Sequence, residues 1–193
     1  LGVSFHKEVA DSIVSFSNGI PAICHQLCLS ACIAANVRTA ADSVAFIRKP
    51  HLQEAVKEFV ASASDSIRER FQRAVRRERI RKYDNYSVAL RAVCEAPLEG
   101  GTIGELTVLI GKIESGYPVN NIGRYLDSLA TEGRGAVLRK DSASGRYFFT
   151  DPFIRSYAQA FFRDAVVKVY PAGTKRVSVG LEDLLREVKI ILE

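Results

Sequence analysis

The segment from residue 83 to 162 constrains the fold most, because its start and stop signals follow one another closely. A first helix is predicted at about residues 87–96, where apolar residues recur at helical spacing before Pro97. A second helix is predicted to begin at Thr102, because Glu105 stands three residues later and the two can form a capping box. Two successive helices, separated by a glycine turn, therefore open this segment.

The rest of the segment predicts a third helix, a hairpin and a last helix. Apolar residues at helical spacing extend from Pro118 to Gly133, with the proline in the first turn. Two short runs, 136–139 and 146–150, flank five turn-forming residues and pair most simply as an antiparallel hairpin. Asp151 can cap the helix that follows the hairpin.

Three helices followed by a hairpin is the order of a winged helix, whose third helix commonly enters the DNA major groove. Asparagine can pair with adenine edges, and arginine with guanine or phosphate. Asp127 and Glu132 weaken the positive field of the helix, so a solvent-facing role explains the same residues equally well. The predicted DNA contacts are Asn120, Asn121, Arg124 and Ser128 in the third helix, with Arg139, Lys140 and Arg146 in the wing.

Residues 1–65 carry helical patterns throughout and predict a small all-helical bundle. Pro50 is predicted to break the pattern. The predicted fold is therefore mainly α, a helical bundle followed by a winged helix-turn-helix domain with a small β-hairpin wing. The helices of the bundle are expected at about residues 5–16, 20–37, 39–47 and 51–63.

Residues 66–83 are predicted to form a basic connector helix between the bundle and the winged helix. Eight basic residues and two glutamates give residues 68–82 a net charge of +6, above the +5 of the whole chain. An apolar stripe favours an ordered helix over a tail. Its basic face either stays solvated or contacts nucleic-acid phosphates. The residues assigned to the second role are Arg73, Arg76 and Arg77.

The length of 193 residues allows two small domains, each with a core. The winged helix is assigned to residues 84–163, and an extension with an amphipathic helix at about 180–192 to residues 164–193. No apolar run approaches the roughly 20 residues of a membrane span. The first residues lack a signal-peptide pattern. We therefore expect a cytoplasmic protein with no membrane partner.

Three of the four cysteines, Cys24, Cys28 and Cys32, recur every fourth residue and stack along one helix face. A metal site would add His25, but that side chain points about 100° away from Cys24 on a helix. Cysteine also packs as a small apolar residue. Core packing is therefore favoured over a metal site or a disulfide, and no metal ligand is assigned.

The chain opens on Leu1 and contains no methionine. We therefore expect it to be a piece of a longer polypeptide. The alternative is that modified methionines are missing from the sequence, in which case some spacings would shift by one residue.

The segment Ser17 to Ile23, which leads into an Ala-rich helix, resembles the Gly-x-Pro signature in the lid of STAND and related AAA+ ATPases. Residues 125–129 and 146–155 resemble the end of the winged helix in archaeal-type and origin-recognition ATPases. The resemblance covers about residues 5–163 and implies that the bundle is lid-like.

In such a lid Gly19 and Pro21 would lie near the bound nucleotide, which would be ATP or ADP with Mg²⁺ in the parent protein. Ala22 stands where many AAA+ lids carry a phosphate-sensing arginine, which favours the STAND-like branch. The chain has no G-x-x-x-x-G-K-[ST] phosphate-binding loop. The resemblance therefore implies no cofactor and no hydrolysis in this chain alone, and a nucleotide-binding domain of the same polypeptide as its partner.

No nucleophile with a partner base is evident, since the three histidines are scattered over helical patterns. We therefore expect no independent enzyme. The first hypothesis is the regulatory C-terminal part of an ATPase, whose winged helix binds double-stranded DNA or packs as a nucleotide-dependent switch. The alternatives are a stand-alone DNA-binding transcriptional regulator and a protein-interaction adaptor, and the oligomeric state stays open.

Overall fold

The computed structural model describes residues 2–39, 44–77 and 82–169. These residues are mainly helical and form eight α-helices, two short 3-10 helices and two two-stranded sheets. The chain divides into two compact units, residues 1–161 and 162–193. The helix predicted at 180–192 lies outside the described residues. Within these residues, no helix combines the length and apolar character that crossing a membrane requires.

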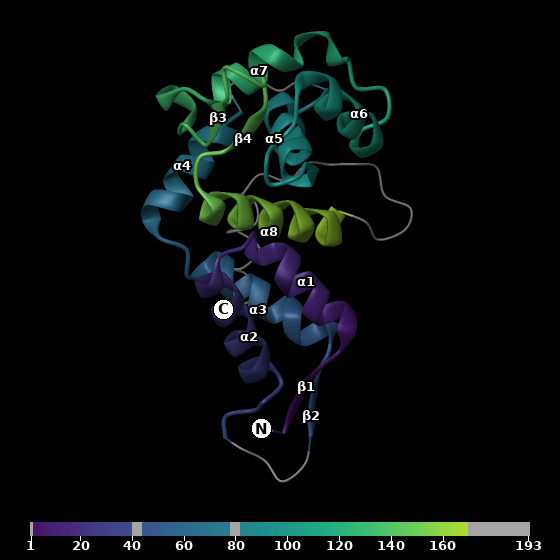
Figure 1. Cartoon of the computed structure of the whole chain (residues 1–193), viewed down its shortest axis with the longest axis vertical. Helices are drawn as coiled ribbons and strands as arrows, with labels where there is room; N and C mark the ends of the chain where they lie inside the picture. The colour runs from purple at the N-terminus through teal and green to yellow at the C-terminus, as the bar shows by residue number, and fades with distance from the viewer. Residues whose placement is uncertain (1, 40–43, 78–81, 170–193) are drawn as a thin grey trace, which may run out of the picture. The chain divides into compact units, whose positions relative to one another are not determined.

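The first elements of the chain, which are labelled in Figure 1, build a core that also includes Ala160 of a later helix. Val9, Ile13 and Phe16 of one helix pack against Ile23 and Leu27 of the next. Spacings of three and four residues put these side chains on facing stripes. The elements are β1 (Val3–Phe5), α1 (Lys7–Ser17), α2 (Pro21–Ala34), β2 (Ala45–Ile47) and α3 (Lys49–Ala61).

The prediction that this part is entirely helical is wrong. β1 pairs with β2 in a parallel sheet, with Val3 opposite Ala45 and Phe5 opposite Ile47. The helix predicted at 39–47 is replaced by β2 at its end, and residues 40–43 lie outside the described residues. Three-residue strands are too short for a period of two to stand out, and they are stabilised by pairing between segments distant in sequence.

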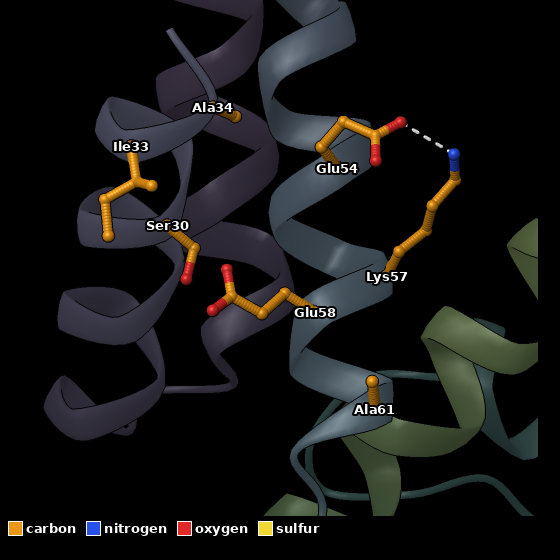
Figure 2. Close-up of a pocket in the computed structure, with 7 residues that line it drawn as sticks. All are labelled: Ser30, Ile33, Ala34, Glu54, Lys57, Glu58 and Ala61. Atoms are coloured by element: carbon orange, nitrogen blue, oxygen red, sulfur yellow. Dashed lines mark hydrogen bonds and ion pairs between the residues drawn. The ribbon is translucent and has the colours of Figure 1, made fainter. Parts of the chain in front are cut away.

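The fourth predicted helix of the bundle, 51–63, begins earlier than expected. α3 starts at Lys49, so Pro50 lies in its first turn instead of breaking the pattern. A proline is tolerated there because the first helical N–H groups have no partner within the helix. α2 and α3 leave an open groove of about 320 Å³ between them (Figure 2). The groove is lined by Ser30, Ile33, Ala34, Glu54, Lys57, Glu58 and Ala61.

The predicted order of three helices, a hairpin and a last helix is confirmed in the second half of the chain. β3 and β4 pair antiparallel, with Arg139 opposite Phe148. The elements are α4 (Asp65–Val75), α5 (Asn85–Glu95), α6 (Ile103–Ile113), α7 (Ile122–Leu129), β3 (Leu138–Lys140), β4 (Tyr147–Phe149) and α8 (Pro152–Val169).

The third predicted helix, 118–133, is divided. A 3-10 turn, Val119–Asn121, precedes α7, and a second one, Glu132–Arg134, follows it. Asn121 has φ −109° and ψ 11°, outside the α-helical range, which separates the first turn from α7. Short 3-10 turns are common at the ends of α-helices.

The predicted capping residues are confirmed. The Thr102 backbone N–H donates to the Glu105 carboxylate at 2.8 Å, while the Glu105 N–H donates to the Thr102 hydroxyl. Asp151 accepts a hydrogen bond from the N–H of Phe153 at 2.8 Å. These local contacts satisfy N–H groups that have no acceptor within their own helix.

The first turns of α8 contact both α1 and the residues that follow α5. Ser156 donates to the carbonyl of Phe16 in α1 at 2.8 Å. Arg155, which is 6% exposed, donates to the carbonyl of Pro97 just after α5 at 3.1 Å. The Tyr157 ring lies edge-on to Phe71 of α4, with 5.1 Å between their centres. One helix therefore holds three others.

The α4 helix packs against the elements that follow it in sequence. Its Arg70 side chain donates to the carbonyls of Gly135 and Ala136, at 2.9 and 2.7 Å, and to the Thr150 hydroxyl. Arg134 returns a hydrogen bond to the carbonyl of Arg76 at 2.6 Å, beyond the end of α4. Two sets of hydrogen bonds therefore hold the described part of the basic connector against residues 134–136. Arg70 makes one set from within α4, and Arg134 makes the other just beyond the end of α4.

Two glycines test this description of the fold. Gly111 lies inside α6, where an added Cβ meets no atom within 4 Å, so Gly111→Ala should raise the free energy of unfolding by about 0.5–1 kcal/mol. Gly135 has φ +78°, and a Cβ there would overlap the Arg70 carbonyl oxygen. Gly135→Ala should therefore destabilise the chain. Urea unfolding followed by circular dichroism measures both changes, and equal effects would contradict the packing of α4.

Candidate nucleic-acid interface

The start of α7 presents the polar residues predicted to contact DNA. Ile122, Leu126 and Leu129 are buried, which turns the opposite face of the helix outward. Asn120 and Asn121 in the 3-10 turn, and Arg124 in α7, have exposed side chains. Within the described residues, none of these three side chains forms a hydrogen bond or an ion pair with the protein. They are available to an external ligand.

The fourth predicted residue of this helix, Ser128, is only partly exposed. Its hydroxyl lies 3.4 Å from the hydroxyl of Tyr86 on α5. The Tyr86 ring in turn packs edge-on against Tyr125, with 5.2 Å between centres. Ser128 therefore contributes to the packing of α7 on α5 more than to its outer face.

A group of tyrosines fixes the position of α7, and the sequence analysis missed it. The Tyr117 hydroxyl donates to Asn85 at 2.8 Å, and the Asn85 amide donates to the Tyr125 hydroxyl at 3.0 Å. Burial raises the pKa of Tyr117 to about 12. The tyrosines come from positions far apart in sequence, so their spacing gives no signal. They hold both ends of the segment that carries the predicted DNA contacts.

The two faces of the hairpin place its basic residues apart. The Lys140 ammonium lies 3.6 Å from the Asp127 carboxylate of α7, and Tyr147 donates to the same carboxylate at 2.6 Å. The hydrogen bond with Tyr147, together with Asp127, raises the pKa of Lys140. Because side chains alternate along a strand, Arg139 lies on the other face, with its guanidinium 4.3 Å from the Phe148 ring centre. The hairpin does not bring Arg139 and Lys140 together.

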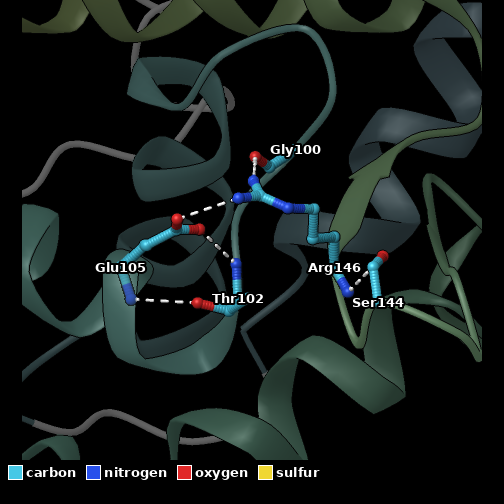
Figure 3. A network of polar contacts seen from close by, with 5 residues as sticks. All are labelled: Gly100, Thr102, Glu105, Ser144 and Arg146. Atoms are coloured by element: carbon cyan, nitrogen blue, oxygen red, sulfur yellow. Dashed lines mark hydrogen bonds and ion pairs between the residues drawn. The ribbon is translucent and has the colours of Figure 1, made fainter.

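Arg146 is held by the protein itself (Figure 3). Its guanidinium donates to the Gly100 carbonyl at 2.6 Å and forms an ion pair with Glu105 at 2.9 Å. The Thr102 N–H and Arg146 hold the pKa of Glu105 below its ordinary value. Arg146 therefore joins the wing to the capping box of α6, which reduces its use as a phosphate contact.

The predicted contacts on the basic connector are also partly neutralised. Arg73 lies 3.8 Å from Glu69, and Arg77 lies 2.8 Å from Asp84. Arg76 is exposed. Exposed ion pairs are weak, but each places a carboxylate beside the cation and lowers the local positive potential. The basic composition of this segment therefore overstates the charge that it offers to a polyanion.

Three further arginines have structural roles that the sequence did not reveal. Arg70 and Arg134 join α4 to the hairpin segment, and the Arg134 guanidinium lies 3.8 Å from the Tyr86 ring centre. Arg155 donates to backbone carbonyls at the end of α5, and burial lowers its pKa. A sequence gives no sign of an arginine that binds carbonyls brought close only by folding.

The Gly-x-Pro turn lies between α1 and α2. Gly19, with φ +77°, and Pro21 are exposed. Asn18, immediately before them, is buried and has φ 50°. Its side-chain amide donates to the Ser156 hydroxyl at 2.7 Å and to Gln159 at 3.2 Å. The turn itself is open to solvent, while the residue before it is fixed to α8.

The interpretation of the α2 cysteines as packing residues is confirmed. Cys24, Cys28 and Cys32 are partly buried and pack against the core of the bundle. Burial, and then the neighbouring Cys24, raises the pKa of Cys28 to about 11. No group of three or more potential metal-binding side chains occurs among the residues the structure covers.

Comparison of the chain with protein-family models, with curated proteins and with solved structures found no match. Among the described residues, the start of α7 and the turn that contains Gly19 and Pro21 both place exposed groups on a fixed support.

The environment of Cys28 predicts that its thiol reacts slowly with alkylating reagents. A pKa raised from 9.0 to about 11 lowers the thiolate fraction near pH 8 by about a hundredfold, and the thiolate is the reactive form. Iodoacetamide should therefore alkylate Cys28 about a hundredfold more slowly in the folded chain than in the urea-unfolded chain. Pulse alkylation followed by mass spectrometry of the Cys28 peptide measures this ratio. Equal rates would contradict the packing of this face of α2.

Proposed function

We propose that this chain is a non-catalytic regulatory region of an ATPase of the AAA+ or STAND class. In this proposal the bundle is the lid, residues 84–163 are a winged helix, and the nucleotide lies near Gly19 and Pro21. The observation that carries the proposal is the contact between Asn18 and α8, which joins the Gly-x-Pro turn to the helix leaving the hairpin.

Buried hydrogen bonds extend this connection in both directions. Asn18 and Ser156 share the carbonyl of Phe16 as an acceptor, at 3.0 and 2.8 Å. Gln159 accepts from Asn18 and donates to the carbonyl of Cys94 in α5 at 3.4 Å. Buried polar groups that lose their partners destabilise a protein, so these elements are expected to move together. A displacement of the turn by nucleotide would then reach the winged helix.

The exposure of the turn supports its place beside a nucleotide. An added Cβ at Gly19 would meet no atom within 4 Å, so another molecule can approach the backbone there. The chain has no phosphate-binding loop, and ATP or ADP with Mg²⁺ would be held by an accompanying nucleotide-binding domain. The chain would act on that domain through the lid, and would not itself catalyse hydrolysis.

A second candidate function is binding of double-stranded DNA through α7. The observation that favours it is the exposure of Asn120, Asn121 and Arg124 at one end of a helix on a fixed support. The ion pairs of Arg146 and Lys140 reduce the positive charge around them. Binding would therefore be weak and salt-sensitive, as suits a module that also packs as a switch. A stand-alone regulator and a protein adaptor remain the alternatives.

Asn18→Gly tests the connection between the turn and α8. Glycine adopts φ 50° without strain, so the variant loses the hydrogen bonds to Ser156 and Gln159 but keeps the backbone. It should lower the free energy of unfolding by about 1–3 kcal/mol and increase hydrogen exchange in both α1 and α8. Asn36→Gly is the matched control, because Asn36 also has positive φ but is exposed.

The same pair of variants tests the ATPase role. In a protein where this chain accompanies a nucleotide-binding domain, Asn18→Gly should change the rate of ATP hydrolysis and Asn36→Gly should leave it unchanged. Reading the gene on both sides of the segment should reveal a G-x-x-x-x-G-K-[ST] motif. A gene without one, together with no nucleotide-binding partner, would contradict the ATPase role but not the structural connection.

Arg124→Ala tests DNA binding. If Arg124 contacts a phosphate, the slope of log affinity against log salt for a generic duplex should fall by about 1. Lys7→Ala removes the same charge from α1 and should leave the slope unchanged. Fluorescence anisotropy across a salt series measures both. Absence of binding at low salt, or an equal loss in the two variants, rules out α7 as the contact.

A further inference from the structure

The α2 helix is apolar on two faces. Its sequence from Pro21 to Ala34 contains no Asp, Glu, Lys or Arg. The inner face buries Ile23 and Leu27 completely. On the outer face, Leu29 is 63% exposed and Ile33 is 44% exposed. A helix that is hydrophobic all round is typically covered on all sides, so the outer face of α2 is expected to meet another surface.

The residues that line the groove beside this face indicate which kind of ligand it favours. Ile33 and Ala34 of α2 and Ala61 of α3 supply its apolar lining. Glu54 and Glu58 add two carboxylates from α3, and Figure 2 shows the Glu58 carboxylate directed toward α2. The lining is therefore partly apolar, and Glu54 and Glu58 beside Lys57 give the α3 side one net negative charge.

The two carboxylates, Glu54 and Glu58, differ in whether another side chain pairs with them. Glu54 forms an ion pair with Lys57 at 2.7 Å. In the part of the chain that the structure describes, the Glu58 side chain has neither an ion pair nor a hydrogen bond. A carboxylate at the edge of an apolar groove favours a cation from the molecule that fills the groove.

We propose that the outer face of α2 and this groove bind an amphipathic helix of a partner protein, with a Lys or Arg side chain that pairs with Glu58. Apolar side chains of the partner would cover Leu29 and Ile33. Helices recognised in this way use anchors at positions i, i+3, i+4 and i+7. The 14 residues of α2 span about 20 Å, enough for two or three such anchors.

Charge distinguishes this occupant from two others. A second copy docked symmetrically through the same face would bring its own Glu58 to the same groove, and like charges repel. An anionic membrane surface would meet the same repulsion. The chain as a whole is +5, so attraction of a basic helix must come from a local acidic site. The inference does not depend on the proposed ATPase role.

Two synthetic 14-residue peptides test the proposal on the whole chain. Both carry leucine at the same helical positions, while one carries lysine and the other glutamate elsewhere. Fluorescence anisotropy should show binding of the lysine peptide, and the glutamate peptide should bind about tenfold more weakly. Peptide binding at the groove is measured as the binding that the double variant Leu29→Asn, Ile33→Asn loses relative to the unchanged chain. Both residues are exposed, and circular dichroism checks that the variant is folded.

A charge reversal provides the sharper test. The double variant Glu54→Lys, Glu58→Lys should bind the glutamate peptide in preference to the lysine peptide. Glu95→Lys, Glu132→Lys makes the same change in net charge on exposed residues elsewhere, and should keep the original preference. Loss of preference in both variants would overturn the proposal, because the attraction would then follow net charge.

Three other outcomes would also overturn the proposal. The first is lysine-peptide binding that survives Leu29→Asn, Ile33→Asn. The second is self-association in sedimentation velocity that this variant abolishes, which would make a second copy the occupant. The third is binding to phosphatidylserine vesicles that depends on Leu29 and Ile33, which would assign the face to a membrane surface.

Discussion

The arrangement of the described chain depends on the polar side of α8. Ser156 is fully buried and bonds to α1, while Arg155 is 6% exposed and bonds to the end of α5. A buried hydroxyl or guanidinium without partners would destabilise the fold, so the rotation and the position of α8 are both fixed. The edge-on contact between Tyr157 and Phe71 adds apolar packing, which is less directional than these hydrogen bonds.

The same requirement explains why several arginines of the second half of the chain are used for contacts within the protein. Arg70 and Arg134 bind backbone carbonyls, and Arg146 binds both a carbonyl and Glu105. Arginine suits this use because its planar group carries five donors. Each of these contacts joins segments distant in sequence, so the arginine side chains hold those segments together. In residues 84–163 these arginines therefore hold neighbouring segments in place and are not directed outward.

Features that depend on neighbours in sequence were predicted well. The capping box at Thr102, the cap at Asp151 and the order of helices and hairpin all follow from residues within a few positions of one another. The pairing of β1 with β2 could not be predicted, because each strand has three residues and its partner lies about forty residues away. The partners of the site arginines were missed for the same reason, since folding alone selects which carbonyls or carboxylates they meet. Exposure at the start of α7 was predicted because helical spacing fixes which face is buried.

The two proposed ligands of the bundle would act on the same helix. α2 begins directly after the Gly-x-Pro turn, and its outer face carries Leu29 and Ile33. A nucleotide that displaced the turn would therefore displace the first turn of α2, the helix that carries this surface. Coupling between two binding sites is reciprocal. If bound nucleotide changes the affinity for the partner helix by some factor, the bound partner must change the affinity for nucleotide by the same factor. Because Asn18 fixes the turn to α8, a partner bound at α2 would also act on α8 without contacting it.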